Sequence, residues 1–79
     1  MISAKNDAQM ANLLYNVAWL RQHHGISKTK MAKLLGISVQ TLNSLESGIL
    51  PPRVGFAFII RLHEQFQYPV GTLFLDRLQ

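Results

Sequence analysis

The chain contains no cysteine and no long hydrophobic run. Without thiols, neither a disulfide framework nor a thiolate metal site can stabilise the fold, and a reducing, cytoplasmic setting is expected. No apolar run approaches the ~20 residues that a membrane-spanning helix needs, and the polar start at residues 2–7 lacks the apolar stretch of a signal peptide. We therefore expect a soluble protein that depends on its hydrophobic core alone.

Acidic side chains are also scarce. Four Asp and Glu residues stand against eight Lys and Arg residues, which gives a formal net charge of +4. Hydrophobic residues make up 48% of the 79 residues and charged residues only 15%. A chain of this length permits one domain with a single core, here residues 1–79, and its basic balance favours association with polyanions.

The spacing of apolar residues predicts helices along most of the chain. Intervals of three and four residues are typical of amphipathic helices, and no alternating strand pattern is present. The predicted helices span about residues 7–24, 28–35, 39–47, 54–66 and a short part of 70–78. We expect an all-α fold, a compact bundle of about five helices.

The second and third predicted helices are joined by a short turn at Gly36. Glycine adopts positive φ at no steric cost, and Ser27 and Ser38 stand where N-caps would begin the two helices. This arrangement predicts a helix-turn-helix. Leu42 and Leu45 would turn inward from the second of these helices, so that its opposite, polar face is left exposed.

Several residues around this turn form a specific combination. They are Leu20-Arg21, Gly25-Ile26-Ser27-Lys28, Met31-Ala32, Leu34-Leu35-Gly36-Ile37-Ser38, Thr41-Leu42 and Leu45-Glu46-Ser47-Gly48. Over about residues 14–74 the chain resembles the phage-repressor type of helix-turn-helix domain, the Cro/C1 or XRE family. The resemblance implies a lambda-repressor-like fold and a small transcriptional regulator, a repressor, that binds double-stranded DNA.

The resemblance also implies which residues read the DNA bases. Helix 39–47 would lie in the major groove, with Val39, Gln40 and Asn43 at the base edges. Gln and Asn side chains can form paired hydrogen bonds with adenine, and Val39 could pack on a thymine methyl group. A half-site that contains A·T pairs is therefore expected.

Other residues are expected to contact the DNA backbone. Free N–H groups at the start of the second helix can bind a phosphate, and Ser27, Lys28 and Thr29 lie there. By resemblance, Ser44 and Arg53 are two further backbone contacts. Many relatives have glutamine where this chain has Lys28, and the lysine should strengthen salt-sensitive attraction to DNA.

A structural ion pair is implied between Arg21 and Glu46. By resemblance, this pair ties the first helix to the end of the third, so that Arg21 is not mainly a DNA contact. Two unrelated surface charges are the alternative, because exposed ion pairs contribute little to stability.

Large apolar side chains exceed what a core of this size requires. Contiguous exposed apolar patches commonly mark an interface. The resemblance implies a symmetric homodimer that places two recognition helices one turn of DNA apart, ~34 Å. The possible dimer surface comprises Ile49, Leu50, Phe56, Phe74 and Leu75.

Two departures from the family pattern leave a second function open. The recognition face has no Arg or Lys, and the apolar loop Ile49-Leu50-Pro51-Pro52 replaces a polar one. A protein-interaction module of the same fold, antitoxin-like or an adaptor without strong specific DNA binding, is the alternative. The lysines at positions 28, 30 and 33 favour DNA.

Catalytic and metal-binding functions are not expected. His23 and His24 are adjacent on a helix and point about 100° apart, and His63 adds no ligand at suitable spacing. The serines stand at caps and exposed helix positions rather than beside a base. We expect no enzyme, no cofactor, no metal, no small-molecule ligand and no membrane partner.

Overall fold

The structure, a computed structural model, describes residues 4–79, with side chains from residue 8 onward. This part of the chain contains five helices. They are α1 (Ala4–His23), α2 (Lys28–Leu35), α3 (Val39–Glu46), α4 (Ala57–Phe66) and α5 (Val70–Leu75). The described residues contain no strand, so the predicted all-α class is confirmed. Residues 1–3 of the polar start lie outside the described residues. None of the described helices is both long and apolar enough to cross a membrane.

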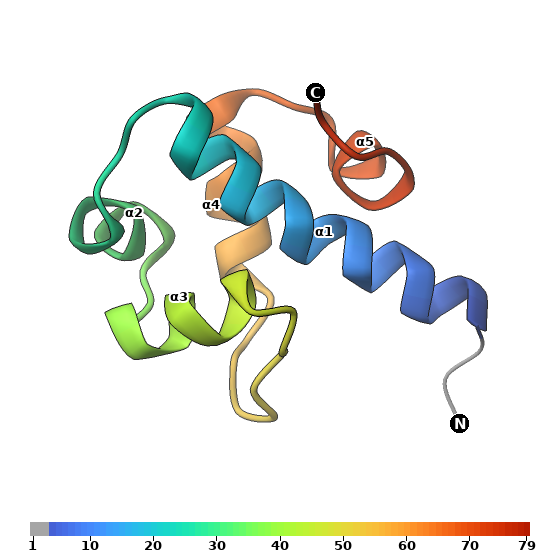
Figure 1. Ribbon diagram of the computed structural model, residues 1–79, viewed down its shortest axis with the longest axis horizontal. Helices are drawn as coiled ribbons and strands as arrows, with labels where there is room; N and C mark the ends of the chain where they lie inside the picture. Colours follow the sequence, from blue (N-terminus) through green and yellow to red (C-terminus); the bar gives the residue numbers. More distant parts are fainter. Residues whose placement is uncertain (1–3) are drawn as a thin grey trace.

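The long α1 helix forms the axis about which the other helices are arranged. Figure 1 shows α3 on one side of α1 and α5 on the other, with α2 beyond the C-terminal end of α1. Helix α4 packs against both α2 and α5. The two helices of the helix-turn-helix therefore lie at one end of the molecule, and the C-terminal segment lies on the opposite side of α1 from α3.

One cluster of apolar side chains joins all five helices. Helix α1 contributes a stripe at three-and-four spacing, and α2 and α3 contribute the inner faces of the helix-turn-helix. Ala32 is small where α2 and α3 pack together, which allows a close approach of the helices. The buried members are Leu13, Leu14, Val17, Leu20, Met31, Ala32, Leu35, Leu42, Leu45, Phe58, Ile59, Leu62, Leu73 and Leu78.

The predicted helix boundaries differ from the observed ones at two starts: α1 begins at Ala4, three residues earlier than predicted, and α4 begins later than predicted. Helix α4 begins at Ala57, three residues later than the apolar spacing predicted. Before it, the N–H of Val54 donates to the carbonyl oxygen of Pro51 at 3.2 Å, which closes a turn. Val54 therefore packs on the core from a loop, and Gly55 belongs to the connection rather than to the helix. The apolar period continues into the loop because both segments cover the same core.

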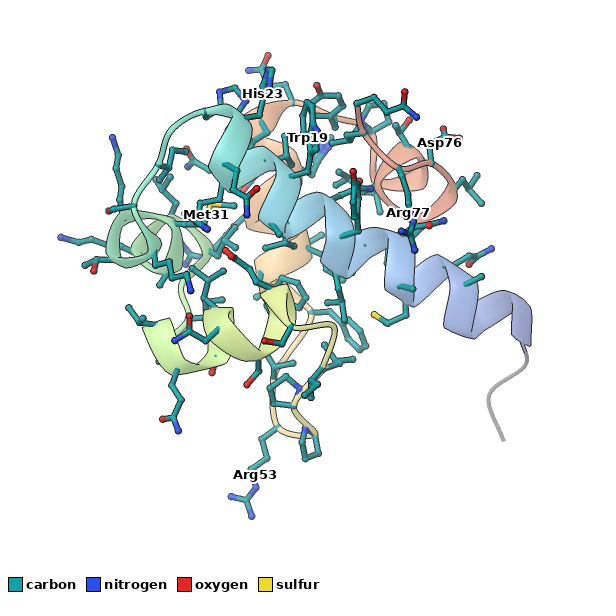
Figure 2. The ribbon with its side chains drawn as sticks, viewed as in Figure 1. Trp19, His23, Met31, Arg53, Asp76 and Arg77 are labelled. Atoms are coloured by element: carbon teal, nitrogen blue, oxygen red, sulfur yellow. The ribbon has the colours of Figure 1, made fainter. Side chains whose placement is uncertain are left out.

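Aromatic rings stack where the C-terminal end of α1 meets the end of α4. The rings of Trp19 and His23 lie parallel, with centroids 4.3 Å apart, and His24 contacts Phe66 at 5.0 Å. Figure 2 shows Trp19 and His23 on the side of α1 away from α3. These rings extend the core at that side of the molecule.

A bidentate ion pair connects α1 to the end of α3. Nε of Arg21 donates to Oε2 of Glu46 at 2.6 Å, and Nη2 donates to Oε1 at 3.0 Å. The side chains are only 16% and 10% exposed. The guanidinium also donates to the carbonyl oxygen of Ile26 at 3.1 Å, so it holds the α1–α2 turn as well. The hydrogen bond to Glu46 raises the pKa of Arg21, so this guanidinium stays charged throughout the working pH range.

The buried Asn16 side chain fastens the C-terminal segment to α1. Its amide donates to the carbonyl oxygens of Leu73 and Asp76, each at 2.8 Å, and its Oδ1 accepts from the N–H of Leu78 at 2.9 Å. These backbone groups stand at the end of α5, where a helix leaves carbonyls without internal partners. The fully buried Asn16 side chain thus provides hydrogen-bond partners for backbone groups at the end of α5.

We expect Glu46→Ala to lower the melting temperature by about 5–10 °C, equivalent to ~1–2 kcal/mol. The substitution leaves the largely buried Arg21 guanidinium without its charge partner. Because the pKa of Arg21 is raised in the folded state, this loss should persist from neutral pH up to the ordinary arginine value. Glu64→Ala, an exposed glutamate on α4, is the control and should leave the melt unchanged. Equal melts for the two variants would contradict a stabilising role for the pair.

We expect Asn16→Ala to cost about 2–3 kcal/mol, because three buried or partly buried backbone groups lose their partner. Thermal melting should show a drop of at least ~10 °C. Hydrogen exchange should be accelerated most in residues 70–78. If exchange there matched the wild type, the α5 end would be held without Asn16, by its apolar contacts and by the hydrogen bond from the Asn12 amide to the carbonyl oxygen of Phe74.

Candidate nucleic-acid interface

The turn between α2 and α3 favours glycine because of its backbone conformation. Gly36 has φ 70° and ψ 33°, and its N–H donates to the carbonyl oxygen of Lys33 at 3.2 Å. The N–H of Ile37 donates to the carbonyl oxygen of Ala32 at 3.0 Å, which completes a Schellman closure of α2. A Cβ at Gly36 would also stand 3.0 Å from Nε of Arg61. The turn therefore sets the angle at which α3 leaves α2.

Serine side chains cap both helices of the pair. The hydroxyl oxygen of Ser27 accepts from the N–H of Lys30 at 3.1 Å, and that of Ser38 accepts from the N–H of Thr41 at 3.0 Å. The first turn of α2 contains no acidic residue. Its positive helix end is therefore not neutralised locally and, with the exposed Thr29, faces solvent where a phosphate could approach.

Helix α3 is packed on one side and open on the other. Leu42 and Leu45 are completely buried, whereas Val39, Gln40 and Asn43 are exposed. The structure thus brings the three predicted base contacts together on one uncovered edge. This edge is rigid because the buried leucines anchor the helix on α1 and α2.

Ser44 and Ser47 are directed into their own helix. The Ser44 hydroxyl donates to the carbonyl oxygen of Gln40 at 3.3 Å, and the Ser44 side chain is half-buried. The Ser47 hydroxyl donates to the carbonyl oxygen of Asn43 at 2.9 Å. Of the predicted backbone contacts, Ser44 is therefore the one least available to a phosphate.

One contact at the edge of α3 was not predicted from the sequence. Nζ of Lys28, the first residue of α2, donates to Oδ1 of Asn43 at 2.8 Å. The two residues are 15 positions apart, and no local pattern relates them. The helix-turn-helix angle brings them together, so a predicted phosphate contact touches a predicted base contact.

Basic side chains lie on both sides of this edge. Lys28 contacts α3 from α2, which also exposes Lys30 and Lys33 elsewhere on its surface, and Figure 2 shows Arg53 projecting from the α3–α4 loop on the side where α3 lies. Glu46 is the only acidic residue between positions 27 and 56, and Arg21 neutralises it. The field over the exposed edge is therefore positive, as an interface for a polyanion requires.

The predicted dimer surface divides into separate parts. Leu50 and Phe74 are half-buried and pack against the core. Ile49, Phe56 and Leu75 are 60%, 64% and 63% exposed. Figure 1 shows the α3–α4 loop and α5 on opposite sides of α1, so Leu75 stands apart from the other two. The exposed Ile60 lies one turn beyond Phe56, and we refer to Ile49, Phe56 and Ile60 together as the loop group.

The histidines serve packing and helix termination in the structure. Nδ1–H of His63 donates to the carbonyl oxygen of Tyr68 at 2.6 Å, just beyond the end of α4. The ring of His23 stacks on Trp19, and the ring of His24 meets His23 edge-on and Phe66 at a tilt. Within the described part of the chain, no group of three or more His, Cys, Asp or Glu residues could hold a metal ion.

Comparison with known proteins identifies the family of this arrangement. A family model described as Helix-turn-helix matches residues 17–73, which include α2, α3 and the turn between them. No match is found among curated proteins or among solved structures. The matched segment carries the capped helices, the glycine turn and the exposed edge described above. The chain therefore belongs to the XRE family of helix-turn-helix proteins, Cro/C1-type, a family of DNA-binding regulators.

Proposed function

We propose that this chain binds double-stranded DNA in a sequence-specific manner and regulates transcription, with α3 in the major groove. One observation carries the proposal. Helix α3 leaves one edge open to solvent, and this edge presents Val39, Gln40 and Asn43, which can contact base edges. The family is non-enzymatic in general, and the chemistry of this edge is recognition rather than catalysis.

The surroundings of α3 support the proposal. The major groove of B-DNA, ~12 Å wide, admits a single α-helix, and phosphates line both of its edges. With α3 inserted, the N-terminus of α2 with Ser27, Lys28 and Thr29 would face one strand. Arg53, at the tip of the α3–α4 loop, would face the backbone or the minor groove nearby. Phosphate contacts on two flanks would fix the register in which the base contacts are made.

We further propose that the protein acts as a homodimeric repressor. Occupying an operator blocks other proteins from it, which needs no element beyond the interface itself. Ile49 and Phe56 stand near the two ends of the α3–α4 loop, and with Ile60 they make up the exposed apolar loop group. A symmetric contact through this loop group would pair two copies of α3, which operators with half-sites ~34 Å apart require.

The same exposed loop group supports a second candidate function. An interaction module of this fold could use Ile49, Phe56 and Ile60 to bind another protein, with no role for base recognition. The two candidates differ in their use of the lysines on α2. DNA binding needs the lysines to neutralise phosphates, whereas an adaptor does not.

Titration against a random-sequence duplex at two salt concentrations separates these functions. With about three phosphate contacts in each subunit, affinity should fall roughly 50-fold for a monomer, and on the order of 10³-fold for the proposed dimer, between about 50 and 200 mM monovalent salt. Fluorescence anisotropy of a labelled duplex measures this dependence. No binding of the duplex at the lower salt concentration would eliminate the DNA-binding proposal in favour of the adaptor.

Sedimentation at micromolar concentration, with and without duplex, tests the dimer. We expect a dimer in the wild type and a shift toward monomer in Phe56→Ser, because the substitution removes an exposed apolar contact from the loop group. Leu75→Ser removes a side chain of nearly the same exposure on the opposite side of α1 and should remain dimeric. A wild type that stays monomeric on DNA would rule out the proposed dimer.

A further inference from the structure

The contact between Lys28 and Asn43 places a cation at a base-reading edge that has none of its own. Helix α3 contains neither Lys nor Arg. Lys28 comes from α2, and its Nζ reaches Oδ1 of Asn43 at 2.8 Å. Both side chains are exposed, so the pair is open to a ligand of α3.

Helix stability does not account for a lysine at this position. Lys28 is the first residue of α2, where the positive end of the helix dipole disfavours a cation. No acidic residue in the first turn compensates for it. The lysine stands beside the exposed edge of α3 and interacts there with a side chain that is itself exposed.

The chemistry of an ammonium group fixes the orientation of the Asn43 amide. An ammonium group has three N–H donors and no acceptor, so the amide atom that faces it is the oxygen. The amide nitrogen of Asn43 then points away from Lys28 with its two N–H groups. Since the oxygen is already engaged, the pair offers mainly donors to a third partner: the amide N–H groups and the remaining N–H groups of the ammonium.

Guanine is the base whose major-groove edge suits such a pair. It presents two acceptors, N7 and O6, whereas adenine combines the N7 acceptor with an N6 amino donor. Cytosine presents an amino donor, and thymine presents one acceptor beside a methyl group. A donor-rich pair matches guanine at both positions and opposes the amino group of adenine.

We propose that Lys28 and Asn43 act as one unit that reads a guanine in the half-site bound by α3. The inference rests on the proposed DNA-binding function and names a base for it. Lys28 is then a specificity-determining residue as well as a source of charge. Asn43, which could pair with adenine if it were unoccupied, reads guanine because of its neighbour. Gln40 keeps its own capacity for adenine at a separate base pair.

Selection of bound sequences from a random duplex pool tests the unit. The wild type should enrich guanine at one position of each half-site. In Lys28→Met, the guanine-to-adenine ratio at that position should fall at least ~5-fold, because the free Asn43 amide can then pair with adenine. Lys28→Arg keeps the donors and should retain guanine. Asn43→Ala should lose the preference at this position, and Gln40→Ala should lose a preference at another.

Lys33→Met is the matched control for the change in charge. Lys33 is also exposed on α2 but lies about 140° around the helix axis from Lys28. Its substitution should weaken all sequences alike and leave the selected motif unchanged. Thermal melts of every variant, measured in parallel, show that each retains the fold.

Two results would overturn the inference, and they differ in whether the proposed DNA-binding function survives. If Lys28→Met weakens all sequences equally and keeps every base preference, Lys28 contacts only phosphate, and the proposed function survives without the guanine-reading unit. If the wild type binds no duplex even at low salt, the proposed function and the inference fail together.

Discussion

An eight-residue helix is not stable alone in water, so the exposed edge of α3 depends on the burial of its opposite face. Leu42 and Leu45 supply that burial, and both are completely enclosed by the core. The bidentate contact between Arg21 and Glu46 then fixes the last turn of α3 to α1. These interactions hold a short helix in one rigid position. The polar side chains on its exposed edge are therefore not needed to stabilise the helix.

The parts of the fold that were predictable from sequence are those set by neighbouring residues. The bounds of α2 were predicted as observed, because Ser27 caps one end and Gly36 terminates the other through its own backbone geometry. The start of α4 was predicted too early. There the apolar spacing continued through Val54, but the chain satisfied it with a turn at Pro51 rather than with a helix.

The site shows the same division between local and distant information. The exposure of Val39, Gln40 and Asn43 follows from the helical period once the buried leucines are identified. The contact of Lys28 with Asn43 and the fastening of the C-terminal segment by Asn16 do not follow, because each joins residues far apart in the chain. Only the angle between the helices determines such pairs. For the same reason, the predicted dimer surface mixed side chains that the fold directs to different places, with Phe74 against the core and Ile49 in solvent.

The parallel stacking of Trp19 on His23 provides the molecule with an intrinsic optical reporter. The chain has one tryptophan, so its fluorescence comes from a single place, on the side of α1 away from α3. Emission should therefore change when the ring of His23 separates from Trp19 on unfolding. A nucleic acid held by α3 would remain out of reach of this indole. Tryptophan emission can thus report unfolding of the domain while a nucleic acid is bound.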